Sequence, residues 1–235
     1  KIEQADKLIA SGLDSIIFAM DGISQETYEP YRQGGSLESV LQAIRTVAAR
    51  RRELNSRTPF VNLRFIVMKH NEHEIPKLKE LAKSLGVDAL TLKTLNPVNQ
   101  DFYSENKSEV RIKNEFLPQD HHYHRFKYDS TGQNVIRVRR NPCKQVWNNP
   151  VIHWSGAVCS CTYDPKEKYV LGHLKHQTFK NIGLGIPYRR LRRQFRADWG
   201  KLPLCRDCSY AYEGGNCYNQ IIADAIFFNT GDLGQ

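Results

Sequence analysis

Long hydrophobic runs and early cysteines are what this sequence of 235 residues lacks. Its longest apolar stretches, 15–20 and 225–228, are far too short to cross a bilayer, so we expect no membrane-spanning helix and no membrane partner. Nothing near the start resembles a signal peptide, and we expect a cytoplasmic protein. Six cysteines are too few for a small secreted domain held by disulfides. With 40% hydrophobic residues, the chain has enough apolar surface for a packed core.

Acidic residues are also scarce, since 25 of them stand against 34 basic residues, for a net charge of +9. This balance permits an anionic partner but does not require one. The densest basic stretch, 186–199, has helical spacing with Leu191 and Phe195 among its arginines. A nucleic-acid surface is one interpretation. We favour a solvated helix face that packs through Leu191 and Phe195, so nucleic acid is not an expected partner.

Helix and strand patterns alternate along the first 96 residues. Strand–helix–strand alternation at this spacing predicts parallel strands with crossover helices. Asn71 and Glu74 are spaced as a capping box, and the continuous run 15–20 is typical of a strand buried on both faces. Three such strands leave a sheet edge open, so we expect a further part of the protein upstream of Lys1. Apolar spacing places helices over 2–10, 37–48 and 75–85, and strands over 15–20, 60–68 and 88–93.

A polar segment of weak periodicity, 97–142, comes next, and we place a domain boundary within it. Three histidines within 121–124 are interpreted as a solvated or substrate-facing loop rather than as a metal site. The stretch 133–140 has the pattern of a strand. A hairpin is predicted over 151–161, with its turn at Ser155-Gly156.

The six cysteines all follow residue 142 and form the most informative pattern. Cys205 and Cys208 make a two-residue chelate. Cys143 precedes the hairpin, whereas Cys159 and Cys161 lie on its second strand, where we expect them to face the same side. Buried free thiols account for one or two of the six. Four thiolates suit zinc and iron–sulfur clusters alike, so spacing leaves both open.

Taken together, the motifs resemble radical SAM proteins with a C-terminal auxiliary-cluster domain of the SPASM/Twitch type. The matching stretches in the first half are 11–44, 65–75 and 77–93, and those in the second half are 143–164, 169–182, 188–194 and 204–208. The family pattern of the second half falls on Cys143, Gly156, Cys161, Asp164, Leu171, Gly172, Cys205 and Cys208.

This resemblance implies an α/β fold, with the C-terminal half of a partial (β/α)6 radical SAM barrel over 1–96. A connecting segment over 97–142 and a small α+β Twitch/SPASM-like domain over 143–235 follow. The implied cofactors are an auxiliary [4Fe–4S] cluster, together with S-adenosylmethionine (SAM) and a second [4Fe–4S] cluster in the intact protein. Cys159 and Cys217 are left as spares, either of which can replace one of the four. The implied cluster ligands are Cys143, Cys161, Cys205 and Cys208.

Active-site residues of parallel β/α barrels lie at the C-terminal ends of strands. The resemblance places Asp21 on the ribose hydroxyls or ammonium of SAM, and Arg32 suits its carboxylate. Plainer alternatives are a turn residue for Asp21, a solvated loop arginine for Arg32, a helix cap for Asn71 and core packing for Ile66. Lys93 points either into the barrel mouth or outward. These five residues are the predicted cofactor-binding set.

Three departures from the family pattern matter. The Cys-x3-Cys-x2-Cys loop of the SAM-cleaving cluster is absent; in the family it lies upstream, which puts ~100 residues before Lys1. This chain alone is therefore not expected to cleave SAM. Only Cys217 follows Cys208, whereas a full SPASM domain has two further ligands there, which favours a single cluster. Ala19 stands where the family has the serine of Ser-x-Asp, so a hydroxyl contact to SAM is lost.

The resemblance implies an oxidoreductase in which a 5′-deoxyadenosyl radical abstracts hydrogen from the substrate. The auxiliary cluster would then accept an electron or position the substrate. A carbohydrate-type small molecule is favoured by analogy, and a ribosomal peptide is the alternative. A flavodoxin or ferredoxin is the expected electron donor. No side chain identifies itself as catalytic. A non-enzymatic zinc module and a basic nucleic-acid-binding protein are the rival classes.

Overall fold

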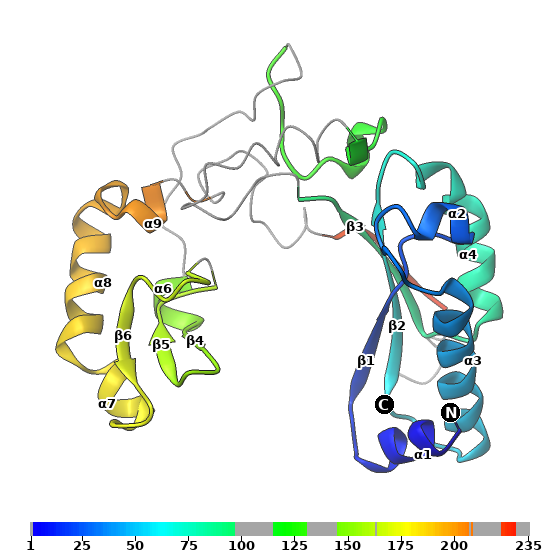
Figure 1. Ribbon diagram of the computed structural model, residues 1–235, viewed down its shortest axis with the longest axis horizontal. Coiled ribbons are helices and arrows are strands. Elements are labelled where there is room, and N and C mark those ends of the chain that lie inside the picture. The colour runs from blue at the N-terminus through cyan, green and yellow to red at the C-terminus, as the bar shows by residue number, and fades with distance from the viewer. Residues whose placement is uncertain are drawn as a thin grey trace. The chain divides into compact units, whose positions relative to one another are not determined.

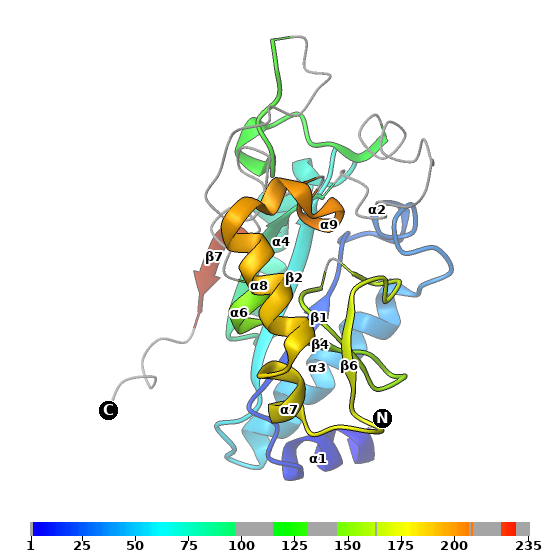
Figure 2. The ribbon, with the colours of Figure 1, turned by 90° about the vertical axis from the view of Figure 1, so that its left-hand side faces the viewer.

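The computed structural model describes residues 2–96, 115–130, 145–162, 164–206, 208 and 222–228, and the predicted strand at 133–140 lies outside them. The chain divides into two compact units (Figures 1 and 2). The first unit comprises 1–97, 110–125 and 217–235, and the second comprises 98–109 and 126–216.

A four-stranded sheet forms the centre of the first unit, in the order β1-β2-β3-β7. The strands β1 (Ser15–Ala19), β2 (Phe60–Val67) and β3 (Ala89–Thr94) are parallel, as predicted. The strand β7 (Ile222–Phe227) pairs antiparallel with β3. The sequence boundary of 143–235 put this last strand in the second domain. It joins the first sheet instead, because the backbone edge of β3 needs a hydrogen-bonding partner.

Helices of the first unit pack on one face of this sheet (Figure 1). They are α1 (Ile2–Ala10), α3 (Leu37–Glu53) and α4 (Ile75–Ser84), with the short α2 (Gln25–Tyr28) and the 3-10 turn Glu72–Glu74 between them. Ser36 caps α3 by accepting a hydrogen bond from the backbone N–H of Ser39 at 3.2 Å, as predicted. Ile44, Leu63 and Leu78 are fully buried at the interface between helices and sheet.

The prediction that β1 is buried on both faces is wrong. Its residues alternate between exposed and partly buried, and the side chain of Ile17 is 49% exposed. The run is continuous in hydrophobicity, but β1 is the outer strand of the sheet and has helices on one face only. Hydrophobicity alone does not tell an edge strand from a central one.

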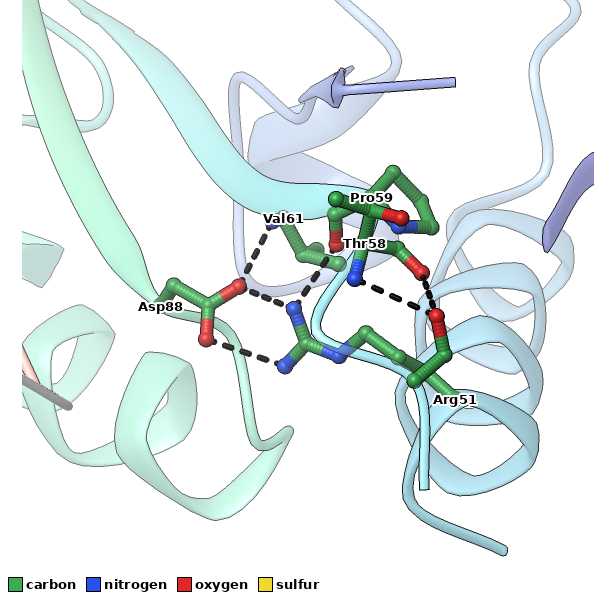
Figure 3. A network of polar contacts seen from close by, with 6 residues as sticks. Arg51, Thr58, Pro59, Val61 and Asp88 are labelled. Atoms are coloured by element: carbon green, nitrogen blue, oxygen red, sulfur yellow. Dashed lines mark hydrogen bonds and ion pairs between the residues drawn. The ribbon is translucent and has the colours of Figure 1, made fainter. Parts of the chain in front are cut away.

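An ion pair fixes the amino-terminal ends of β2 and β3 (Figure 3). Arg51, in the last turns of α3, donates to both carboxylate oxygens of Asp88 and to the carbonyl oxygen of Pro59 at 2.8 Å. Asp88 also accepts from the backbone N–H of Val61 at 2.7 Å. A bidentate pair of this kind fixes orientation as well as distance. It therefore holds α3 and two strand starts in one arrangement.

The second unit contains a small antiparallel sheet and a set of short helices. Its strands are β4 (Val151–Ile152), β5 (Ala157–Cys159) and β6 (Val170–His173), which confirms the predicted hairpin. The helices are α6 (Gln145–Asn148), α7 (Phe179–Gly183), α8 (Ile186–Asp198) and α9 (Pro203–Arg206), with a 3-10 turn over Trp199–Lys201.

The basic helix α8 packs as predicted. Phe195 is buried against Val146 and Leu202, and the partly buried Leu191 contacts the same cluster. Its arginines 189, 190, 193 and 196 are exposed. Among the described residues of both units, no helix is long and apolar enough to cross a membrane.

Candidate cofactor sites

The two residues predicted to contact SAM after β1 are bonded to each other. Oδ2 of the fully buried Asp21 accepts from Nε of Arg32 at 2.7 Å and from a terminal guanidinium nitrogen at 2.6 Å. Its Oδ1 accepts from the backbone N–H of Ile66 at 2.7 Å. The loop after β1 passes close to the backbone of α2, and only glycine fits at position 22, since a Cβ there would lie 2.3 Å from the backbone nitrogen of Tyr28. Asp21 therefore orients Arg32 and ties the end of β1 to β2.

Asn71 links the carboxyl-terminal ends of β1 and β2 through its side-chain amide. Its side-chain amide donates to the carbonyl oxygens of Asp21 and Ile66, both at 3.0 Å, and its Oδ1 accepts from the N–H of Met68 at 2.7 Å. These three bonds use the whole amide group, which is buried. Asn71 thus holds the strand ends in place, and its contact with a cofactor stays a prediction.

The predicted capping box of Asn71 and Glu74 is wrong, because Asn71 makes no side-chain cap. The buried Glu74 instead accepts from the backbone N–H of Ile23 at 3.1 Å and from the hydroxyl of Thr27 at 2.8 Å. Both partners are about fifty residues away in the chain, so sequence spacing gave no sign of them. The result is a second bond between the loop after β1 and the start of α4.

Lys93 points away from the helices of the first unit. Lys93 pairs in register with Ile66, so both project from the sheet face that also carries Arg64, opposite the face covered by helices. Lys93 is half-buried, and burial lowers the pKa of its ammonium group. The neighbouring Arg64 and Arg125 lower that pKa further, whereas Asp21 raises it. Lys93 therefore lies in a region of local positive charge.

Two residues, one in β2 and one in the loop after it, were missed as site candidates. His70 follows β2, packs edge-on against Phe116 with ring centroids 5.5 Å apart, and has a buried Nε2 without a hydrogen-bond partner. Burial lowers its pKa, so the ring is favoured in its neutral form. Arg64 lies within β2, between apolar neighbours. The available signal was its charge on a strand whose alternate residues are buried.

In the second unit, two glycines of the family pattern are required by close packing. Gly156, at the hairpin turn, has a φ of +91° and would place a Cβ 2.9 Å from the ring of His173. A Cβ at Gly172 would lie 2.6 Å from Ile182. Any larger side chain would push β6 away from the turn or from α7. The hairpin that carries the cysteines is therefore tightly packed.

Beyond this hairpin the buried Asp164 organises the loop after Cys161. Its carboxylate accepts from the N–H groups of Lys168 at 2.9 Å and Tyr169 at 2.7 Å, and its own N–H donates to the carbonyl of Cys161 at 3.4 Å. β5 ends at Cys159, so Cys161 lies outside the strand. The expectation that Cys159 and Cys161 both lie on the second strand of the hairpin is therefore wrong.

Cys159 and Cys161 differ in their surroundings. Burial raises the pKa of Cys159 to about 12, with a further increase from the carboxylate of Asp164, which the thiol also hydrogen-bonds. The role of Cys159 as a spare stays a prediction.

Cys205 and Cys208 lie on the turn that ends α9. The N–H of Cys208 donates to the carbonyl of Cys205 at 3.3 Å, and buried Leu202 and Leu204 anchor this turn. Cys161, Cys205 and Cys208 are free of disulfides, so this part of the donor set is chemically suited to an iron–sulfur cluster. Cys143 and Cys217 lie outside the described residues. Within those described, no three Cys, His, Asp or Glu side chains are grouped to hold a metal ion.

The histidine segment is a structured turn in the first unit. His122 Nε2 lies 3.2 Å from both carboxylate oxygens of Asp224 on β7, and the rings of His121 and His124 stack at 4.7 Å. The segment thus helps to hold β7 on the sheet, and the described residues form no metal group there.

Comparison with known proteins supports the cysteine region most directly. Residues 143–209 match the family model of the SPASM iron–sulfur cluster-binding domain. This range contains the four predicted ligands and excludes Cys217.

Similarity to individual proteins extends over more of the chain. The chain is 25% identical to the tungsten-containing aldehyde ferredoxin oxidoreductase cofactor-modifying protein of Pyrococcus furiosus, over 88% of this chain and 62% of that protein. It is 31% identical to probable GTP 3′,8-cyclases of Saccharolobus islandicus, over 40% of this chain and 29% of each cyclase. The matches span less than two thirds of each of these relatives. The chain therefore carries a SPASM iron–sulfur cluster-binding domain, and its resemblance to radical SAM proteins with such a domain is confirmed.

Proposed function

We propose that this chain is the carboxyl-terminal part of a radical SAM oxidoreductase with one auxiliary [4Fe–4S] cluster. The observation that carries the proposal is the match of residues 143–209 to the SPASM model, a range that includes the disulfide-free thiols of Cys161, Cys205 and Cys208. With Cys143 they would supply the four thiolates of a [4Fe–4S] site. When bound, such a cluster supplies one-electron transfer.

The first unit supports the other half of this proposal. Its three parallel strands have crossover helices on one face and polar side chains on the other, among them Asn62, Arg64 and Lys93. The outer edge of β1 pairs with no strand among the described residues. We assign this arrangement to the C-terminal half of a partial (β/α)6 barrel whose inner face is the polar one.

Within that barrel, the strand-end residues would hold SAM in a divided role. Arg32 is partly exposed and keeps guanidinium N–H groups beyond those that bind Asp21, so it is the residue to grip a carboxylate. Asp21 and Asn71 are internally bonded and act by fixing Arg32 and the strand ends. Ile66 contributes apolar surface beside them.

The substrate we propose is a small molecule, with a carbohydrate-type compound as the leading class. The names of the relatives, a cofactor-modifying protein and GTP cyclases, refer to small molecules and so favour this over a ribosomal peptide. An oxidation is proposed on family analogy. A flavodoxin or ferredoxin would be the electron donor, and the cytoplasm the location.

Anaerobic reconstitution of the 235-residue chain, followed by measurement of iron, sulfide and zinc, tests the proposal. We expect about four irons and four sulfides per chain, as a four-cysteine [4Fe–4S] site holds. Cys205→Ser should lose most of this iron. About one zinc per chain without sulfide, as in a closed structural site, would support the zinc module and overturn the proposal.

A further inference from the structure

Two cations lie on the face of the four-stranded sheet opposite its helices, and no described residue provides an acceptor for them. Arg64 on β2 pairs with Thr91 on β3, and Lys93 is two residues further along β3, so both side chains project from the same face. The helices of this unit pack on the opposite face (Figure 1). Both residues lie in the carboxyl-terminal half of their strands, the end at which β/α barrels bind ligands.

Neither cationic group has a partner in the described parts of the chain. Nε of Arg64 is buried and has no hydrogen-bond acceptor, and Lys93, though half-buried, makes no hydrogen bond or ion pair with a described residue. Buried polar groups in folded proteins are bonded in the large majority of cases. Two adjacent cations for which the described residues offer no acceptor favour a bound anionic ligand.

The surrounding charges do not supply the missing acceptor. Asp21 is the carboxylate that acts favourably on Lys93, but its oxygens are already engaged by Arg32 and the N–H of Ile66. Arg125, which is 7% exposed and has partners of its own, adds a third positive charge next to Lys93. Burial, Arg64 and Arg125 all lower the pKa of Lys93, because each disfavours its charged form.

The geometry points to an oxyanion-binding site formed by Arg64 and Lys93, which holds a phosphate or carboxylate group of the substrate. The planar guanidinium binds two oxygens of such a group, and the ammonium adds a charge-assisted bond. Asn62, two residues before Arg64 on the same face, accepts a hydrogen bond from the hydroxyl of Thr91 at 3.2 Å. The substrate is thus an anionic small molecule with polar groups beyond its oxyanion. That the bound oxyanion belongs to the substrate rests on the proposed function.

Thermal unfolding of the full chain with inorganic pyrophosphate, at ionic strength held constant with sodium chloride, tests the site. We expect pyrophosphate to raise Tm in the wild type, and Arg64→Gln and Lys93→Met each to weaken its binding at least tenfold. Arg189→Gln, an exposed arginine on α8 in the second unit, is the matched control and should leave binding unchanged. Loss of binding in this control alone, or no effect of pyrophosphate in the wild type, would overturn the proposal.

A second measurement separates lost binding from lost folding. Because Lys93 lies beside two other cations, Lys93→Met without ligand should have a Tm at or above that of the wild type. A strong decrease would mean that Lys93 supports the fold rather than a ligand, against the proposal.

The same titration with SAM distinguishes the source of the oxyanion. If SAM, and not pyrophosphate, stabilises the chain in a manner that needs Arg64 and Lys93, the site serves the cofactor and the substrate assignment is wrong. The metal analysis of the chain is independent of these titrations. A chain with four irons and no pyrophosphate binding refutes only this inference, whereas a zinc-only chain that still binds pyrophosphate refutes only the proposed function.

Discussion

Arg32 and Asp21 form a partly buried ion pair in which two guanidinium nitrogens lie 2.6 and 2.7 Å from one carboxylate oxygen. The pair lies where β1 ends, and the other carboxylate oxygen binds β2. An arginine on a loop thereby acquires one fixed direction, which a solvated loop arginine lacks. Recognition of a ligand carboxylate depends on this kind of fixed geometry.

Removing the arginine should destabilise the first unit. We expect Arg32→Gln to lower the free energy of unfolding by about 2 kcal/mol, because it leaves the buried carboxylate of Asp21 with a single donor. Urea denaturation measures this. Arg45→Gln, which breaks an exposed pair with Glu38, is the control and should cost less than about 0.5 kcal/mol. Equal effects of the two changes would show that the Asp21–Arg32 pair has no special role.

Substitution of Asn71 should lower the free energy of unfolding more than the small size of this residue suggests. Asn71→Leu keeps the branched shape of the side chain but leaves the carbonyls of Asp21 and Ile66 and the N–H of Met68 without this partner. We expect a loss of about 3 kcal/mol in the free energy of unfolding, measured in urea. Gln42→Leu, on the exposed face of α3, should change it by no more than about 0.5 kcal/mol. A loss below 1 kcal/mol, on the order of one hydrogen bond, would contradict the role we give to Asn71.

Acid should destabilise the chain partly through His70. Burial lowers its pKa in the folded protein below the ordinary value of 6.5, so the unfolded chain takes up this proton first. The stability that neutral His70 contributes is therefore complete above about pH 6.5 and is lost as pH falls through the folded-state pKa. Stability measured from pH 7 to 5 should fall less steeply in His70→Phe. An unchanged slope in His70→Phe would refute the assignment.

Serine variants of Cys159 and Cys161 should differ clearly in iron content after reconstitution. We expect Cys161→Ser to lose cluster iron and Cys159→Ser to retain it, because the family pattern falls on Cys161 and leaves Cys159 as a spare. Serine at 159 also keeps a hydrogen-bond donor for the carboxylate of Asp164. Iron and sulfide per chain and the visible absorbance of the cluster measure the outcome. If Cys159→Ser loses iron and Cys161→Ser does not, the ligand assignment must be exchanged.

Local patterns were sufficient for three helices and the three parallel strands of the first unit, but not for α2 and β7. The apolar spacing of 37–48 and Ser36 before it predicted α3, because a helix needs only a buried stripe and a cap that lie close in sequence. The parallel order of β1, β2 and β3 followed from the alternation with helices. The failures were contacts at long range, such as Glu74 with Ile23 and the pairing of β7 with β3.

For the candidate sites, too, local features were predictable from the sequence and long-range contacts were not. The cysteine spacing by itself identified a metal-binding region, since a Cys-x2-Cys turn is a local property of the chain. The sequence also placed Asp21 and Asn71 at strand ends and proposed Arg32 as a partner of the SAM carboxylate. Only the tertiary structure decided that Asp21 and Arg32 bind each other, and that Arg64 and Lys93 share a face on which no described residue accepts a hydrogen bond from them. Such relationships depend on strand register and burial, which bring together residues far apart in the chain and have no local signature in the sequence.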